Sequence, residues 1–303
     1  MPINTNGMNE DYISYFSLEE YVRKIKLLPE VLDHLQDTTN SFDMYMNRLS
    51  KYEQEYIINY WIYLLYEELE SNQKIEGLKF NEISLADKGV FFDRLGISHK
   101  RIHDLHNFAT KEDKDYEESF EYRKSEVNVS YYDKEGKEHI YWRGANKEDV
   151  NRFMSDYIRL YKQNGTSLLF SNPFLVSSLM HLLFLRIHPY KDGNGRTSRI
   201  IHNMKFTESI NKLHNTRLKL SPLNLSQSIL LNKITYVKRI DQIYFDLEHD
   251  TNKSINDWFD FILYMADEQI YSSTEKLSNI DITYLKEEEK EKVRQMRLTR
   301  FNK

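Results

Sequence analysis

The stretch His-Pro-Tyr-Lys-Asp-Gly-Asn-Gly-Arg-Thr-Ser-Arg, residues 188–199, decides how the rest of the chain is interpreted. It combines an imidazole, a carboxylate, an amide between two glycines and two guanidiniums, with little that could fill a hydrophobic core. This composition indicates a functional loop. We expect the flanking segments to hold the loop in place.

The segments on either side of the loop predict helices. Asn172-Pro173 places an N-cap residue before a proline at the first helical position, which is a strong signal for a helix start. The helix that it opens, through Ile187, is apolar almost all round, so we expect it to be the central buried helix. A second helix is expected from Thr197 to about Leu213.

Other helices are predicted along most of the chain. Ser17 and Glu20 have the spacing of a capping box, and we expect Pro29 to end or kink the helix that starts there. Apolar residues at helical spacing predict further helices over residues 42–75, 147–162, 225–248 and 255–276. Residues 1–16 are interpreted as a loose arm, and the charged tail 281–303 as a solvated helix or a frayed terminus.

One segment predicts β-structure. Residues 126–132 alternate between apolar and polar, 133–136 form a turn, and 137–142 are again strand-like, which predicts a β-hairpin. An isolated hairpin is marginally stable, so this one must pack on the helical body or bind something. The predicted fold class is therefore all-α with one hairpin.

Composition excludes several functional classes. The net charge of −5 and pI of about 6.1 argue against a nucleic-acid-binding surface. The absence of cysteine excludes thiolate catalysis, disulfides and cysteine zinc sites, and it suits a cytoplasmic location. No apolar run is long enough to span a membrane, and residues 1–7 lack the features of a signal peptide.

Three histidines share one face of a short predicted helix that Ser98 caps. His99, His103 and His106 are spaced at i, i+4 and i+7, so they could present three imidazoles to a zinc ion. No acidic residue that would orient them is obvious. A packed or solvated helix face is the favoured interpretation.

The glycines of the 188–199 loop indicate an anion site. Gly193 and Gly195 permit positive φ angles and let the backbone approach a ligand closely. With Asn194 between them at the start of a helix, successive amides would form a concave nest for an anion.

The charged residues of the loop extend this prediction to a nucleoside triphosphate. Arg196 and Arg199 lie three residues apart on one helix face and would clamp a polyphosphate. Asp192 would suit a Mg²⁺ shared with phosphate oxygens, and His188 could accept a proton from an attacking hydroxyl. The loop is neither a P-loop nor a dinucleotide fingerprint.

The stretch resembles the signature of the Fic (filamentation induced by cAMP) family, His-Pro-Phe-x-Asp/Glu-Gly-Asn-Gly-Arg-x-x-Arg, with Tyr190 in place of the usual phenylalanine. Asn203 also matches a frequent asparagine of that family. The resemblance implies a Fic-like helical bundle with a hairpin flap at 126–142. It divides the chain into an N-terminal helical region (1–60), a Fic domain (61–270) and a charged C-terminal helix (271–303).

The resemblance implies a protein adenylyltransferase that moves AMP from ATP to a Ser, Thr or Tyr hydroxyl of a target protein or of the chain itself. His188 would deprotonate the hydroxyl, and Asp192 would hold Mg²⁺ on the α- and β-phosphates. Gly193, Asn194 and Gly195 would hold the phosphates by backbone and amide hydrogen bonds. Arg196 would stabilise the pyrophosphate leaving group, and Arg199 would bind the γ-phosphate.

Two further features are expected on the same basis. The flap would pair with the target backbone as an added strand, and family members often form homodimers. We expect adenine contacts from the helices after residue 225, where Tyr236 is a candidate; a packed tyrosine is an equally good interpretation.

A second resemblance lies upstream. Asn72-Gln-Lys-Ile-Glu76-Gly77 is similar to the family's inhibitory-helix motif Ser/Thr-x-x-x-Glu-Gly/Asn, with Asn72 in place of Ser/Thr. The resemblance implies that Glu76 pairs with Arg199 and occupies the cation that the γ-phosphate needs. The other interpretation is an ordinary exposed glutamate before a C-cap glycine.

Two alternatives to adenylyl transfer stay open. The same loop could remove AMP from a modified protein, with Glu76 orienting a water, or transfer a different nucleotide or phosphate-linked group. The second alternative is a non-catalytic module that binds nucleotide and peptide. The intact base, metal carboxylate and both arginines argue against a non-catalytic module.

Overall fold

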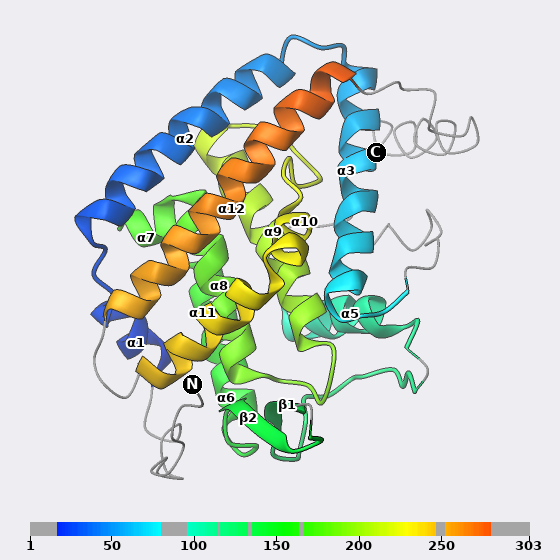
Figure 1. The fold of residues 1–303 in the computed structure, drawn as a ribbon, viewed down its shortest axis with the longest axis vertical. Helices are drawn as coiled ribbons and strands as arrows, with labels where there is room; N and C mark the ends of the chain where they lie inside the picture. The colour runs from blue at the N-terminus through cyan, green and yellow to red at the C-terminus, as the bar shows by residue number, and fades with distance from the viewer. Residues whose placement is uncertain are drawn as a thin grey trace.

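The computed structural model describes residues 17–79, 96–113, 115–132, 135–163, 167–246 and 252–279. Within these ranges the protein is a bundle of helices with one two-stranded sheet, which confirms the predicted all-α fold with a hairpin (Figure 1). None of the helices described is both long enough and apolar enough to cross a membrane. The expected N-terminal arm and the charged tail lie outside the described residues.

Helix α8 (Pro173–Ile187) forms the centre of the bundle, and each of its residues is buried. The Asn172 side chain caps it by accepting hydrogen bonds from the N–H groups of Phe174 (2.9 Å) and Leu175 (3.3 Å). The hydroxyl of Ser177 donates to the Pro173 carbonyl at 2.7 Å, so this buried polar group is satisfied. The predicted bounds and the burial of this helix are confirmed.

Helix α9 (Asn194–His214) packs along α8, and the other helices surround this pair. Those that contact α8 or α9 include α3 (Gln54–Ile75), α5 (His99–Thr110), α6 (Val150–Lys162), α7 (Leu168–Ser171), α10 (Leu225–Leu231) and α12 (Asn252–Asn279). The pair is therefore shielded from solvent, and the loop between α8 and α9 is presented on a rigid base.

The outer layer includes α2 (Pro29–Leu49), which runs beside α12 along its length (Figure 1). The Asn256 side chain of α12 accepts from the Leu28 N–H at 2.8 Å and donates to the Lys26 carbonyl at 2.8 Å. These bonds fix the segment between α1 (Leu18–Lys24) and α2. Helix α11 (Lys233–Asp246) also packs on α12.

The predicted hairpin is present as β1 (Asn128–Tyr132) paired antiparallel with β2 (Glu138–Arg143). Val129 lies opposite Trp142, whereas Ser130 lies opposite Ile140, so the register contains a bulge. The Trp142 side chain is buried in the core, and that of Ile140 is exposed. The hairpin is thus anchored on one face and open on the other, at one end of the bundle (Figure 1).

Several predicted helix bounds were wrong. Pro29 begins α2 instead of ending the first helix, and the pattern over 42–75 divides at residues 50–53 into α2 and α3. The predicted helix 225–248 divides at Asn232 into α10 and α11. The helix expected from 147 begins at Val150.

The contact between α2 and α12 includes a histidine that lies between two carboxylates. His34 Nδ1 lies 2.7 Å from Asp260 Oδ1, and its Nε2 lies 2.9 Å from Asp267 Oδ2. Burial alone would lower the pKa of His34, but the hydrogen bonds to the two carboxylates outweigh it and raise the pKa. Because the folded pKa lies above the unfolded value of about 6.5, the stabilisation is complete below that pH and is lost as the pH rises through the folded pKa.

We predict that His34→Gln lowers the free energy of unfolding at about pH 6 by ~0.5–1 kcal/mol, a range reduced for solvent screening of these partly exposed groups. The difference from wild type should shrink towards about pH 9, as the imidazole loses its proton in the folded state. Urea titrations at the two pH values measure it, with His214→Gln as a comparison, because His214 Nε2 lies 3.6 Å from a single carboxylate, that of Asp43, on the surface. An equal loss at both pH values would contradict a charged His34.

Candidate active site

The last turn of α8 delivers His188 to the loop in a left-handed backbone conformation, with φ 52° and ψ 61°. Its N–H donates to the Phe184 carbonyl at 2.9 Å and closes the helix. Nδ1 lies 3.3 Å from the Leu185 carbonyl, which can only accept, so Nδ1 carries the proton. The nitrogen left to accept a proton from another group is therefore Nε2.

The surroundings of His188 keep its imidazole neutral. Burial lowers its pKa to about 4, with a smaller lowering by the Arg123 guanidinium. The Leu185 carbonyl and the Glu76 carboxylate act in the opposite direction. A neutral imidazole at pH 7 is the form that can act as a general base.

The Asn194 side chain holds the loop that follows. Its Oδ1 accepts from the Tyr190 N–H at 3.0 Å, and its Nδ2 donates to the Tyr190 carbonyl at 2.8 Å. The Asn194 side chain is therefore already engaged within the loop, and its role in binding phosphate stays a prediction. The amides of residues 193–195 remain at the N-terminus of α9, where the helix dipole favours an anion.

Asp192 is placed where it could share a metal with a bound ligand. One of its oxygens accepts from the Gly193 N–H at 2.6 Å, and its side chain is 88% exposed. Among the described residues, no group of three or more histidine, aspartate or glutamate side chains could hold a metal ion by itself. A single exposed carboxylate fits a Mg²⁺ whose other ligands are phosphate oxygens and water.

Gly193 is required by the packing of α5 against the loop. Its φ is 73°, and a Cβ built there would lie 2.9 Å from His106 Cε1 and deep inside the contact distance of Thr110 Cγ2. Both the backbone angle and the lack of space therefore exclude a larger residue.

The histidine face of α5 packs on tyrosines. The rings of His106 and Tyr190 are stacked, with centroids 3.6 Å apart, and the Tyr190 hydroxyl lies 2.8 Å from His103 Nδ1. His99 Nδ1 lies 2.9 Å from the Tyr122 hydroxyl. The hydroxyl that distinguishes Tyr190 from the usual phenylalanine thus has a partner, and these imidazoles support the loop.

Arg199 is paired with the carboxylate that the sequence predicted. Its Nη2 lies 2.6 Å from Glu76 Oε1, and the guanidinium side chain is 2% exposed. Burial alone would raise the pKa of Glu76, but Arg199 outweighs it and holds the pKa below the usual value. A Cβ on Gly195 would lie 2.7 Å from Glu76 Oε1, so this glycine makes room for the carboxylate.

Asn72 takes part in the same contact. Arg199 Nε donates to Asn72 Oδ1 at 2.5 Å, and Asn72 Nδ2 donates to the Arg196 carbonyl at 3.2 Å. Gly77, with φ 75°, lies directly after α3, and its N–H donates to the Lys74 carbonyl at 3.0 Å. The asparagine therefore connects α3 to α9 as donor and acceptor.

Arg196 is held by a residue that the sequence analysis missed. Its Nη1 and Nη2 lie 2.6 and 2.8 Å from the two carboxylate oxygens of Asp113, just beyond α5. Nη1 also donates to the Ala109 carbonyl at 3.1 Å, and the guanidinium side chain is 2% exposed. Asp113 belongs to an acidic stretch without periodicity, so no sequence signal identified it.

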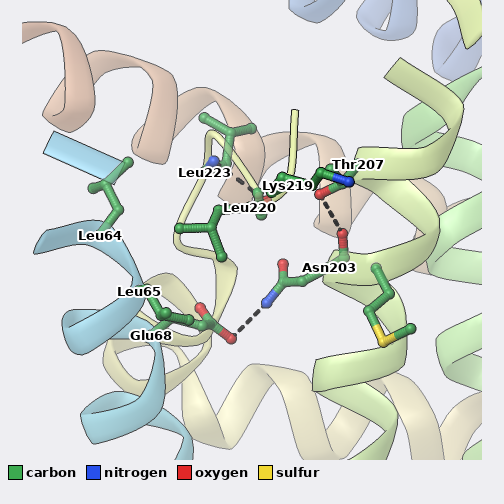
Figure 2. A pocket seen from close by; sticks show the side chains of 10 residues that line it. Leu64, Leu65, Glu68, Asn203, Thr207, Lys219, Leu220 and Leu223 are labelled. Atoms are coloured by element: carbon green, nitrogen blue, oxygen red, sulfur yellow. Dashed lines mark hydrogen bonds between the residues drawn. The ribbon is translucent and has the colours of Figure 1, made fainter. Parts of the chain in front are cut away.

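Asn203 lies away from the loop, whereas Tyr236 lies close to Arg199. Asn203 Nδ2 donates to Glu68 Oε1 at 2.8 Å beside a cavity of about 30 Å³ (Figure 2). That volume suits one or two waters, not an adenine ring. Tyr236 is buried, with its hydroxyl 2.8 Å from His181 Nε2, and it lies close enough to Arg199 to interact with the guanidinium.

The structure thus brings most of the predicted residues together. The residues that meet at the junction of α3, α5, α8 and α9 are His188, Asp192, the 193–195 backbone, both arginines, Glu76, Asn72 and Gly77. Asn203 and Tyr236 contact the far side of this junction.

Residues 96–204 match the model of the Fic/DOC family. A search of the curated proteins found no match.

Two solved structures have a similar fold. A Fic family protein from Desulfovibrio desulfuricans G20 is 14% identical, with a TM-score of 0.56 over 84% of this chain and 77% of that one. A Fic domain containing signaling protein from Bacteroides thetaiotaomicron VPI-5482 is 14% identical, with a TM-score of 0.54 over 82% of this chain and 99% of that one. Residues 96–204 thus match the Fic/DOC family model, within a chain whose fold is similar to that of two Fic family structures.

Proposed function

We propose that the protein is an adenylyltransferase that transfers AMP from ATP to a hydroxyl side chain of a target protein, and that Glu76 restrains it. The observation that carries the proposal is the 2.6 Å ion pair between Glu76 and Arg199, beside a motif in which His188 Nε2 has no hydrogen-bond partner among the described residues. Members of the family commonly catalyse this class of nucleotidyl transfer.

His188 supplies the base. Its Nε2 takes the proton of the target hydroxyl while the hydroxyl oxygen forms a bond to the α-phosphorus of ATP. The bond from that phosphorus to the bridging oxygen breaks, and pyrophosphate leaves with the electron pair. The neutral imidazole, fixed by its Nδ1 contact with the Leu185 carbonyl, is ready for this step without prior loss of a proton.

The helix N-terminus and the arginines supply the electrostatics. The amides of residues 193–195 lie where the α9 dipole favours the phosphates. Arg196 would face charge that develops on the pyrophosphate, and Asp113 holds its guanidinium in a fixed plane. Asp192 would hold a Mg²⁺, which would neutralise phosphate charge when bound.

Glu76 would act by competition. Its carboxylate occupies Arg199 Nη2, the donor that a γ-phosphate would use, and Asn72 engages Nε of the same guanidinium. ATP that binds without this cation would have its α-phosphate misaligned for attack. Among the described residues the β1–β2 hairpin is a two-stranded sheet, so the outer edge of each strand is where a target strand could pair.

We predict that Glu76→Gly and Glu76→Gln raise labelling of a target, or of the protein itself, by α-labelled ATP roughly tenfold or more, because each frees Arg199 for the γ-phosphate. His188→Ala in the same background should reduce labelling by about 10²- to 10⁴-fold through loss of the base. Labelling in a cell lysate with each of the four nucleoside triphosphates measures both effects and the nucleotide preference.

Glu70→Gln is the matched control for Glu76→Gln. Glu70 lies on the same helix but pairs with Lys74 at 2.7 Å on the exposed side, so its loss should leave labelling unchanged. If His188→Ala labels as well as its parent, the assignment of the base is wrong. Release of AMP from a modified protein, lost in Glu76→Gly, would instead indicate the reverse reaction, and nucleotide binding without any transfer would indicate a binding module.

A second prediction concerns pH. Because the neutral imidazole is the base, activity is present above the pKa of His188, which burial lowers to about 4, and is lost as the pH falls through it. Removing Glu76 takes away a group that raises this pKa, so the released variant should not titrate at a higher pH. We expect kcat/KM of Glu76→Gln to stay nearly constant from about pH 8 down to about pH 5. An inflection near 6.5 that is absent from ATP binding would contradict the assigned environment of His188.

A further inference from the structure

Arg123 has no role in the reaction described above, yet its guanidinium is buried beside the catalytic histidine. The residue is 6% exposed. Its Nε donates to the His188 carbonyl at 2.7 Å, and its Nη1 donates to the Ser125 carbonyl at 2.6 Å. Its Nη2 donates to the carbonyls of Ala145 and Ile187. Every acceptor in this set is a main-chain carbonyl.

These carbonyls belong to two parts of the protein whose relative position a transferase must fix. Ile187 and His188 are the end of α8 and the proposed base. Ser125 precedes β1 and Ala145 follows β2, so they are the two stems of the hairpin. One guanidinium thus joins both stems to the backbone that carries the base.

Backbone hydrogen bonds continue the same connection. The Ala145 N–H donates to the Ile187 carbonyl at 3.2 Å, and the Arg123 N–H donates to the Pro189 carbonyl at 2.9 Å. The Gly144 N–H donates to the Val127 carbonyl at 3.0 Å and closes the base of the hairpin. The hairpin stem is therefore fixed on both sides of His188.

Gly144 shows how closely the stem approaches the base. A Cβ built on Gly144 would lie 2.8 Å from Arg123 Nη2 and 3.0 Å from His188 Cβ. Distances of this kind force a neighbour to move, and here the neighbours are the buried guanidinium and the proposed base itself. A glycine at this position lets the stem lie directly against them.

The chemistry of this contact requires arginine. The planar guanidinium presents five donors in a fixed fork, whereas the lysine ammonium has three on a flexible stem. Four carbonyls in different directions cannot be satisfied by lysine, and each one left unpaired in a buried site carries a cost. The contact also helps to hold His188 in its left-handed conformation, which is strained for a residue with a Cβ.

We propose that Arg123 is a positioning residue that fixes the β1–β2 hairpin relative to His188, so that the hydroxyl of a target segment paired with the hairpin meets Nε2. The effect of Arg123 on transfer rests on the proposed function. The attachment of the hairpin to the His188 backbone can be tested without that function. Loss of Arg123 should let the hairpin move relative to His188, while the nucleotide-binding residues on α9 stay in place.

The test compares Arg123→Lys with Arg186→Lys, both in the Glu76→Gln background. Arg186 is 7% exposed and lies near the same end of α8, but it acts electrostatically on Tyr21 of α1. The pair therefore controls for burying a lysine in place of a buried arginine. Gly144→Ala is a second, independent perturbation that keeps the guanidinium.

The first measurement is amide hydrogen exchange of the nucleotide-free protein. We expect Arg123→Lys and Gly144→Ala to speed exchange across residues 126–145 by about tenfold or more, with little change in the other helices, as loss of local hydrogen bonds would produce. Arg186→Lys should leave the hairpin protected. Unchanged hairpin exchange in Arg123→Lys, or a uniform increase over the whole protein, would overturn the proposal.

The second measurement separates positioning from general damage. In Arg123→Lys we expect kcat for transfer to the target to fall by about tenfold or more while KM for ATP changes by less than about twofold, because the nucleotide site on α9 is intact. Equal losses in both parameters, matched by Arg186→Lys, would indicate a structural role only. If the parent Glu76→Gln protein transfers nothing, the proposed function fails, and hairpin exchange still decides whether Arg123 fixes the hairpin.

Discussion

Two guanidiniums buried in the first turns of α9 govern the arrangement of the site. Arg196 and Arg199 are each 2% exposed, and a buried cation is costly unless charge and hydrogen bonds compensate it. Asp113 and Glu76 supply the charge, and groups at the ends of α3 and α5 accept most of the remaining hydrogen bonds. Both α3 and α5 therefore have to end at the N-terminus of α9. Together these helix ends enclose the loop that follows α8.

The central part of the fold was predictable because its signals are local. Asn172-Pro173 marks the start of α8, and the uniform apolarity up to Ile187 marks its burial. Pro29 was misassigned because proline is as compatible with the first turn of a helix as it is disruptive inside one. The division at residues 50–53 contains neither glycine nor proline; it arises because α2 packs on α12 and α3 on α10, which only the tertiary structure establishes.

The residues of the candidate site also fall into two groups: those that local sequence signals predict and those that depend on distant partners. The residues of 188–199 are contiguous and chemically distinctive, so their convergence could be predicted from the sequence. Arg123 and Asp113 are single charged residues in irregular segments, where a solvent-exposed side chain is the ordinary expectation. Their roles depend on partners 65 and 83 residues away in sequence, at His188 and Arg196, and no spacing rule reaches that far.

The position of Glu76 determines how quickly the restraint on Arg199 could be lifted. The residue is the C-cap of α3, and its side chain is 39% exposed, whereas Asn72 and Ile75 just before it are buried in the core. The carboxylate can therefore leave by rotation about its own side-chain bonds while the helix stays docked. Such a rotation leaves the helix in place and needs no undocking of α3, but the buried Arg199 requires a bound phosphate to replace the carboxylate as it leaves. Under the proposed function, restraint would then follow nucleotide and target concentrations at each encounter without the delay of a slow global rearrangement.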